Sequence, residues 1–279
     1  MALVSFRSDV FAALHEGCVR GGHRPSLYLT GRARRSRRPS YPNMGEKVTD
    51  ILGGMPVDID LLLPASPESM ATALRGYAID VAVVCGFSWR LPRVVLDAPR
   101  LGVLNVHCSS LPRYRGPAPV QWAIRNGDPD IGVTVHWMDE RIDTGNVVAR
   151  REGISLPEFV EFDAFWRHVT PVIGDLLVFA LARVAEGYGG EPQNPDEATY
   201  AGMMEPEFSF LDWSGTASDL HNQVRTFHYG TGTPGPFGKV AGEWVRVLRT
   251  SLEPGKGTRV DCADGPIWLV ETEPARPPS

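Results

Sequence analysis

Short apolar runs alternate with amphipathic stretches over the first half of the chain. Continuous apolar runs suit strands that are covered on both faces of a sheet. The run from Ile79 to Val84 predicts such a strand, and further strands are predicted at Ala2 to Phe6, Ser26 to Leu29, Val57 to Leu63 and Leu101 to Val106. Helices are predicted between them, over Ser8 to Arg20 and Pro67 to Arg75. This alternation favours an α/β fold with a Rossmann-like, mostly parallel sheet and helices on both of its faces.

The second half of the chain has a different pattern. Pro117 to Arg125 predicts a helix with proline in its first turn. Gly132 to Met138 and Asn146 to Arg150 predict a pair of strands around a polar loop. Apolar residues at helical spacing over Phe162 to Glu186 predict a helix that packs in the core. A further helix is expected over Ala217 to Phe227, followed by short strands.

The end of the strand predicted at Leu101 to Val106 carries candidate catalytic residues. Asn105 and His107 are two positions apart, so their side chains project from the same face of a strand. An amide can donate a hydrogen bond to an oxyanion, and an imidazole can move a proton. A carboxylate such as Asp143 can fix the imidazole tautomer and raise its pKa. These three groups can carry an acyl group past a tetrahedral intermediate without a covalent enzyme adduct.

Composition and missing motifs exclude several other classes of protein. Hydrophobic residues make up 43% of the 279 residues, which is ordinary for a soluble protein, and the net charge of −5 gives no general attraction to nucleic acid or membrane. The four cysteines and seven histidines lack metal-ligand spacing, so no metal is expected. A serine hydrolase would need a Gly-x-Ser-x-Gly elbow, and the sequence contains none. The first strand is followed by Arg7-Ser8-Asp9, which disfavours a nicotinamide cofactor. With no apolar run near ~20 residues and no signal peptide, a cytoplasmic protein is expected.

Three motifs in one order resemble a known enzyme family. They are Asn105-x-His107, the loop from Ser109 to Gly116 with the sequence Ser-Ser-Leu-Pro-Arg-Tyr-Arg-Gly, and Asp143-Thr144-Gly145. Together they are similar to the 10-formyltetrahydrofolate-dependent formyltransferases, which act on methionyl-tRNA, glycinamide ribonucleotide, amino sugars or hydroxyornithine. The resemblance implies an enzyme that transfers the formyl group of 10-formyltetrahydrofolate, with Asn105, His107 and Asp143 as its catalytic residues.

The resemblance also implies the contacts to both substrates and the organisation of the chain. The folate is expected to contact Phe87, Ser88, Trp89, Arg90, Leu91, Asp139, Glu140 and Ile142, and the acceptor Ser109, Ser110, Leu111, Arg115 and Gly116. We expect a catalytic domain over residues 1–190, a linker over 191–207 and a small β-rich domain over 208–279. The last of these corresponds to a trimmed, β-barrel-like (OB-like) region.

The acceptor of the formyl group is predicted to be a primary amine or hydroxylamine of a small biosynthetic molecule. The stretch Gly230 to Gly238 departs from the Trp-Pro pair common in methionyl-tRNA formyltransferases, and the chain is acidic overall. Five arginines between Arg32 and Arg38 keep a phosphate contact open. Methionyl-tRNA is therefore disfavoured but stays an alternative. A formyltetrahydrofolate hydrolase and an inactive folate- or RNA-binding protein are further alternatives, and the oligomeric state is open, with a homodimer as one option.

Overall fold

Two compact units form the described part of the chain. The structure is a computed structural model, and it describes residues 1–33 and 43–276. The first unit contains Met1–Arg115, Gly132–Glu152 and Trp166–Thr199. The second contains Gly116–Ile131, Gly153–Phe165 and the residues from Tyr200 onward. The domain boundaries expected at 190 and 208 stay a prediction.

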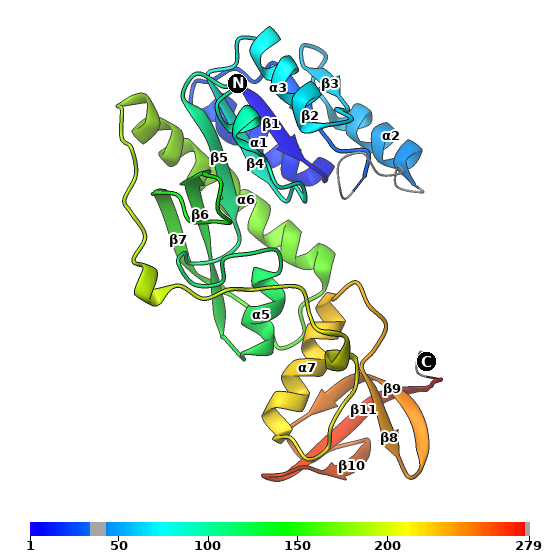
Figure 1. The fold of residues 1–279 in the computed structure, drawn as a ribbon. Coiled ribbons are helices and arrows are strands. Elements are labelled where there is room, and N and C mark those ends of the chain that lie inside the picture. Colours follow the sequence, from blue (N-terminus) through cyan, green and yellow to red (C-terminus); the bar gives the residue numbers. More distant parts are fainter. Residues whose placement is uncertain (34–42, 277–279) are drawn as a thin grey trace. The chain divides into compact units, whose positions relative to one another are not determined.

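The sheet of the first unit is mostly parallel, as the alternation of strands and helices predicts. Its order in the described residues is β3-β2-β1-β4-β5-β6-β7 (Figure 1). Strands β1 to β5 run parallel to one another, whereas β6 is antiparallel to β5. The strands are β1 (Ala2–Ser5), β2 (Leu27–Leu29), β3 (Asp60–Leu62), β4 (Val81–Cys85), β5 (Gly102–His107), β6 (Asp130–Trp137) and β7 (Val147–Ser155).

Helices cover both faces of this sheet. Alternate residues of each strand point to opposite faces, and the face that contains Ala2 and Val4 packs with Met70 and Leu74 in one core cluster. On the opposite face, the rings of Phe11 and Tyr28 stack with centroids 4.0 Å apart. The helices of the first unit are α1 (Ser8–Arg20), α2 (Met44–Gly54), α3 (Pro67–Gly76), α4 (Arg93–Leu96) and most of α6 (Phe162–Ala185).

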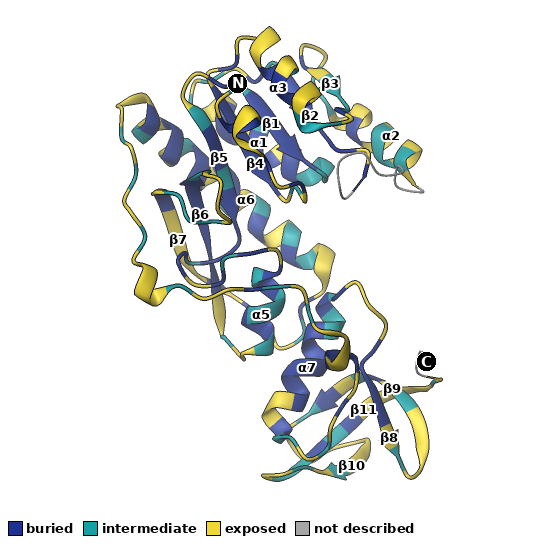
Figure 2. Ribbon diagram, in the orientation of Figure 1, coloured by how far each residue is buried: buried dark blue, intermediate teal, exposed yellow. Residues whose placement is uncertain are grey.

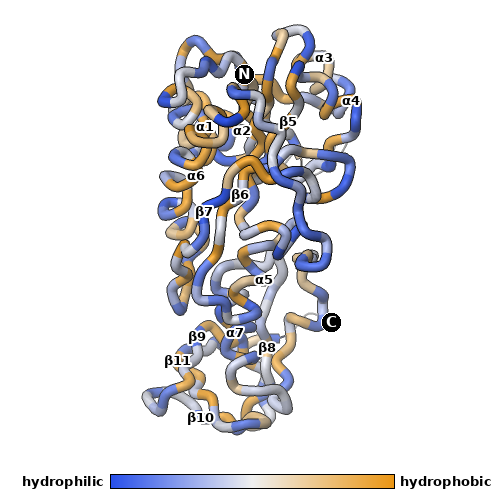
Figure 3. The backbone as a smooth tube through the Cα atoms, turned by 90° about the vertical axis from the view of Figure 1, so that its left-hand side faces the viewer, coloured by the Kyte–Doolittle hydropathy of each residue, from blue (hydrophilic) through white to orange (hydrophobic). Residues whose placement is uncertain are grey.

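Helices α1 and α6 approach each other closely at a pair of glycines. A Cβ atom added to Gly17 would lie 2.7 Å from the carbonyl oxygen of Gly174, which is closer than real contacts allow. Gly17 therefore permits the contact between the two helices. Val169, Ile173 and Leu177 of α6 are buried at helical spacing, and Figure 3 shows apolar residues recurring along this helix.

Among the described residues, α6 alone is long and apolar enough to cross a membrane by length and composition. The expectation that no apolar run approaches this length was therefore too strict. Core helices of soluble proteins meet the same criterion, and the contact with α1 through Gly17 and Gly174 fits such a role.

The second unit contains a smaller sheet covered by one helix. In the described residues this antiparallel sheet has the order β10-β11-β9-β8, and its strands are β8 (Phe237–Val240), β9 (Glu243–Ser251), β10 (Thr258–Asp261) and β11 (Pro266–Pro274). Helix α7 (Ala217–Tyr229) places Leu220 and Val224 against Val247, Ile267 and Leu269. Helix α5 (Pro119–Arg125) belongs to the same unit. These elements confirm the small β-rich region expected near the C-terminus.

Burial explains why some elements escaped prediction. Strands β1 and β4 are buried along their whole length (Figure 2), and apart from Ser5 their residues are apolar. Helix α2 buries Ile51 alone among its residues, and β10 buries none. The exposed strand β10 therefore leaves little apolar signal, whereas α2 has Met44, Val48, Ile51 and Leu52 at helical spacing and was missed in spite of it.

Candidate active site

Strands β5 and β6 bring four polar side chains to one face of the sheet. Asn105 pairs in register with His136, and His107 pairs with Thr134. Residues directly opposite on antiparallel strands point to the same face. His107, Thr134 and His136 are buried, while Asn105 is half-buried. Since a buried polar side chain is costly unless it has a partner, this cluster marks the site.

Asp143 joins these side chains from the loop between β6 and β7. Its Oδ2 atom lies 3.6 Å from Nδ1 of His107, and its Oδ1 atom lies 3.5 Å from Nε2 of His136. The amide nitrogen of Asn105 donates to Oδ1 of Asp143 over 3.3 Å. The structure therefore brings together the three residues that the sequence predicts as catalytic.

A backbone carbonyl fixes the tautomer of His107. Its Nε2 atom lies 2.8 Å from the carbonyl oxygen of Tyr114, an acceptor, so Nε2 carries a hydrogen and donates it. In the neutral ring Nδ1 then carries the lone pair. The separation of 3.6 Å between Nδ1 and Asp143 is longer than a hydrogen bond. A proton taken up at Nδ1 would place the charged ring between two acceptors.

Burial decides the charge of His107 before reaction. It lowers the pKa of the imidazole below its usual value, as does the neighbouring His136, whereas Asp143 and the Tyr114 carbonyl raise the pKa. The cost of burial is larger, so the ring is neutral at neutral pH. Sequence reasoning considered only the carboxylate and therefore expected a raised pKa. A neutral imidazole beside a carboxylate is suited to accept a proton.

His136 is a residue of the site that sequence reasoning missed. Its Nδ1 atom donates to the carbonyl of Trp137 over 2.8 Å, so its Nε2 atom is an acceptor. The amide nitrogen of Asn105 lies 3.2 Å from that acceptor, which fixes which way the amide points. The available signal was the alternation of Thr134 and His136 with valines along a buried strand.

The loop after β5, predicted to contact the acceptor, is held by its own side chains. The hydroxyl of Ser109 donates to the Arg113 carbonyl over 2.7 Å, and the hydroxyl of Thr134 donates to the Ser109 carbonyl over 2.6 Å. Ser109 and Leu111 are fully buried, Ser110 and Arg115 are half-buried, and Gly116 has a φ of +115°. The acceptor contacts of these five residues stay a prediction.

The two loops predicted to hold the folate are linked by a hydrogen bond. The guanidinium of Arg90 donates to the carbonyl of Glu140 over 2.9 Å. Phe87 is half-buried and stacks on Phe6, with ring centroids 4.8 Å apart. Ile142 is exposed. These placements leave the predicted folate contacts open.

Other members of the predicted folate set have structural partners. Trp89 and Leu91 are buried in the core, and the indole nitrogen of Trp89 donates to the Ala33 carbonyl over 2.8 Å. Asp139 accepts from the Arg141 amide and the Thr144 hydroxyl, which shapes the turn before Asp143. Ser88 is exposed. Any folate contact from Trp89 or Leu91 would use only a small exposed surface.

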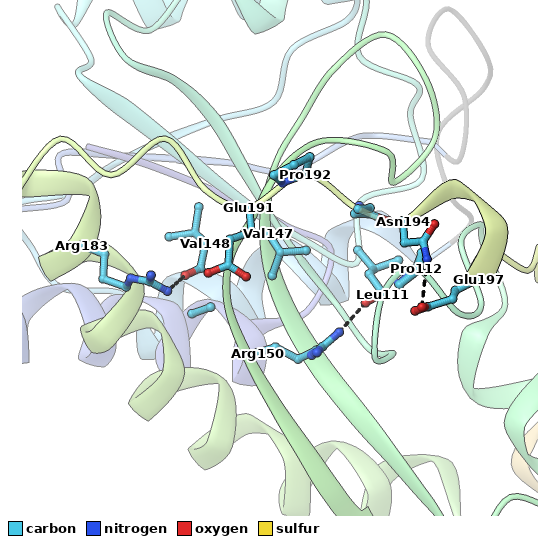
Figure 4. A pocket seen from close by; sticks show the side chains of 12 residues that line it. Leu111, Pro112, Val147, Val148, Arg150, Arg183, Glu191, Pro192, Asn194 and Glu197 are labelled. Atoms are coloured by element: carbon cyan, nitrogen blue, oxygen red, sulfur yellow. Dashed lines mark hydrogen bonds between the residues drawn. The ribbon is translucent and has the colours of Figure 1, made fainter.

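A pocket of about 250 Å³ is lined by residues of β7, the loop after β5 and the segment around Gln193 (Figure 4). It does not contain Asn105 or His107, but Gln193 in its wall contacts the turn. The residues that line it are Leu111, Pro112, Val147, Val148, Ala149, Arg150, Arg183, Glu191, Pro192, Gln193, Asn194 and Glu197.

Other candidate chemistry has little support in the described residues. Burial raises the pKa of the Cys108 thiol to about 12, which makes it a poor nucleophile. No group of three or more His, Cys, Asp or Glu in this part of the chain is arranged to hold a metal ion. Of the arginine-rich stretch, Arg34 to Arg38 lie outside the described residues.

The sequence around the site is similar to the sequences of known proteins. Residues 63–157 match the family model described as formyl transferase. Methionyl-tRNA formyltransferase of Paramagnetospirillum magneticum is 38% identical over 213 residues, which are 75% of this chain and 67% of that protein. The enzyme of the same name from Methylobacterium nodulans is 36% identical over 236 residues, which are 80% of this chain and 74% of that protein.

A solved structure supports the fold independently. WlaRD, described as a sugar 3N-formyl transferase and determined in the presence of dTDP and 5-N-formyl-THF, matches with a TM-score of 0.66. The match covers 97% of both chains at 13% identity, so it shows the fold alone. The predicted Rossmann-like fold with an additional β-rich region is confirmed.

The chain belongs to the formyltransferase family. This membership follows from the identity of more than a third to methionyl-tRNA formyltransferases over most of the chain. It confirms the prediction of a formyl-transfer enzyme that resembles the 10-formyltetrahydrofolate-dependent transferases.

The prediction of a small-molecule acceptor is wrong, and so is the prediction that tRNA is disfavoured. The relatives at 36–38% identity are methionyl-tRNA formyltransferases, whereas the sugar enzyme is only 13% identical. The net charge of −5 does not exclude a tRNA acceptor. A net charge describes the whole chain and says nothing about where its arginines gather on the surface.

Proposed function

We propose that the protein transfers the formyl group of 10-formyltetrahydrofolate to the amino group of methionyl-tRNA. The meeting of Asn105, His107 and Asp143 in one cluster, within a chain similar to methionyl-tRNA formyltransferases, carries this proposal. Such a reaction would take place in the cytoplasm, as predicted for this chain. The folate supplies an activated formyl carbon and a leaving nitrogen.

In this proposal Asn105 stabilises negative charge on the formyl oxygen. Its hydrogen bond to Asp143 is long, at 3.3 Å, and is therefore easily exchanged for a stronger bond to an oxyanion. The contact with His136 keeps the amide nitrogen in place meanwhile. An oxyanion donor that is positioned in advance needs no reorganisation during the reaction.

His107 acts as the general base toward the attacking amine. Burial keeps the ring neutral, and the Tyr114 carbonyl holds the hydrogen at Nε2, so Nδ1 can accept the proton. The resulting imidazolium is stabilised by Asp143 on one side and by the Tyr114 carbonyl on the other. It then returns this proton to the folate nitrogen, which leaves as its bond to the formyl carbon breaks. Asp143 thus matters most after the proton has moved.

The described residues fit a folate donor in two respects. The loops that resemble the pterin-binding loops are joined through Arg90 and Glu140, and both lie at the ends of the strands that lead to the site. Ser88 and Ile142 on these loops are exposed and can contact a ligand. In α/β sheets, ligands bind beyond the carboxyl ends of the strands.

The test is formation of formyl-methionyl-tRNA by the purified protein from 10-formyltetrahydrofolate and charged initiator tRNA. Because tRNA is a polyanion, its binding is expected to weaken steeply as salt rises. Release of tetrahydrofolate at the same rate without tRNA would instead indicate a hydrolase. No formyl transfer and no hydrolysis would contradict the proposal and favour a binding protein.

A further inference from the structure

Two of the groups that face the His107 ring, Asp143 and the Tyr114 carbonyl, belong to residues with unusual backbone. Asp143 has a φ of +53° and Tyr114 a φ of +57°. Left-handed backbone is rarely adopted by residues other than glycine and persists where the surrounding structure fixes it. The position of the imidazole therefore depends on whatever holds these two residues.

Gln193 holds the turn that carries Asp143. Its amide nitrogen donates to the carbonyl of Asp143 over 2.9 Å and to the carbonyl of Gly145 over 2.8 Å. Its amide oxygen accepts from Nε and Nη2 of Arg115, over 3.0 and 2.7 Å. Both amide hydrogens of Gln193 are thus used to fix one turn, and the guanidinium of Arg115 fixes the amide.

Thr199 holds Tyr114 in a similar way. Its hydroxyl oxygen accepts a hydrogen bond from the Tyr114 amide over 2.8 Å. Its backbone carbonyl accepts from the Arg115 amide over 2.9 Å, and its backbone amide donates to the Pro112 carbonyl. Tyr114 is the residue whose carbonyl accepts the hydrogen of His107 Nε2.

We propose that the segment from Gln193 to Thr199, named here the brace, positions His107 for catalysis. Gln193 acts through Asp143 on one side of the imidazole, and Thr199 acts through Tyr114 on the other. Neither side chain contacts the reacting atoms, so both are positioning residues. This inference rests on the proposed formyl transfer for its kinetic test. Composition predicts the same segment as part of a linker.

A positioning role has a signature in the pH dependence. The groups that face His107 are Asp143 from the β6–β7 loop, His136 from β6 and the Tyr114 carbonyl. Asp143 and the carbonyl raise the pKa of His107, against burial and His136. Loosening the brace weakens the two groups that raise the pKa, so the pKa falls further. Since the base must be neutral, the acidic limb of the rate profile then moves to lower pH.

Two pairs of variants separate this role from a general structural one. Thr199→Val removes the acceptor but keeps the shape, while Thr199→Ser keeps the acceptor. Gln193→Glu keeps a partner for Arg115 but replaces the donor to the Asp143 and Gly145 carbonyls with an oxygen, which repels them. Gln193→Ala removes the bonds to these carbonyls and the bonds to Arg115. Asn194→Ala is the matched control, because Asn194 lies in the brace and, within the described residues, its side chain hydrogen-bonds to Asp196 and Glu197 of the same segment.

For formyl transfer, Thr199→Val and Gln193→Glu are expected to lower kcat by about tenfold or more with little change in KM. Thr199→Ser should stay close to the unsubstituted protein, and Gln193→Glu should lose at least as much activity as Gln193→Ala. The acidic limb should move to lower pH in the impaired variants alone. Unchanged kcat and an unchanged limb in Thr199→Val and Gln193→Glu would overturn the inference, as would equal losses in Asn194→Ala.

The imidazole can also be titrated without any substrate, by NMR of His107 in the folded protein. A lower His107 pKa in Thr199→Val, with Thr199→Ser unchanged, supports the brace even if the protein has no activity on methionyl-tRNA. An identical His107 pKa in all variants overturns it. Failure of the proposed function would instead appear as no formyl transfer by the unsubstituted protein.

Discussion

The sheets of the two units differ in how far their strands are exposed to solvent. Strand β4 in the first unit is buried at all of its positions, whereas β9 in the second buries only Val247 and Thr250. A polar side chain costs folding free energy in a buried strand such as β4 unless it has a partner, whereas in an exposed strand such as β9 it costs little. The polar residues of β5 and β6 are therefore informative about chemistry, and those of β9 are not. The same comparison predicts different responses to substitution.

The largest expected effect is on the stability of the first sheet. Leu104 on β5 is fully buried, so Leu104→Ala should lower the free energy of unfolding by about 2–5 kcal/mol. Val270 on β11 is 46% exposed, and Val270→Ala should stay within about 0.5 kcal/mol. Denaturant unfolding of both variants measures the difference. Equal losses would show that the two sheets do not differ as their burial indicates.

Next in size is the loss of activity on removing the amide of Asn105. Asn105→Ala should lower kcat for formyl transfer by about 10²–10³, as expected for one oxyanion donor. Glu243→Gln, at an exposed position of β9, is the control and should keep full activity. Initial rates with saturating substrates, together with thermal unfolding, separate chemistry from folding. A loss below about threefold would remove Asn105 from the mechanism.

Asn105 and Asp143 could be predicted as neighbours in one cluster because their signals in the sequence are local. The alternation of a strand places Asn105 beside His107, and the motif around Asp143 needs no knowledge of distant contacts. His136 and Gln193 were missed because their roles depend on pairing between strands and on a segment fifty residues from Asp143. The prediction of the acceptor was wrong for a related reason. Neither the Gly230–Gly238 stretch nor the net charge shows where basic residues gather on the protein surface.

A smaller loss of activity should follow from substitution of His136. His136→Phe keeps a ring in the buried site but removes the acceptor for the Asn105 amide. A lost buried hydrogen bond costs about 1–3 kcal/mol, so kcat should fall by about tenfold, less than for Asn105→Ala. Comparison of the single and double variants measures the coupling between the two side chains. Strictly additive losses would mean that His136 does not act through Asn105.

The smallest effect is a pH dependence of stability in the second unit, where His221 is buried. Its Nδ1 atom lies 2.8 Å from the hydroxyl of Thr250, and Nε2 lies 3.4 Å from Glu158. Burial, and then Arg225, lower the pKa of His221, while Glu158 raises it. The folded protein therefore binds a proton less readily than the unfolded chain. Stability is complete above the unfolded pKa of about 6.5 and falls as the pH drops below it.

His221→Gln should remove this part of the pH dependence and leave the acidic limb of formyl transfer unchanged, because that limb belongs to His107 in the first unit. One proton can contribute a slope of at most about 1.4 kcal/mol per pH unit. Unfolding of both proteins between pH 5.5 and 7.5, at about half-unit steps, resolves such a slope. If His221→Gln moved the acidic limb instead, the two buried histidines would be coupled, and the chemistry could not be assigned to the first sheet alone.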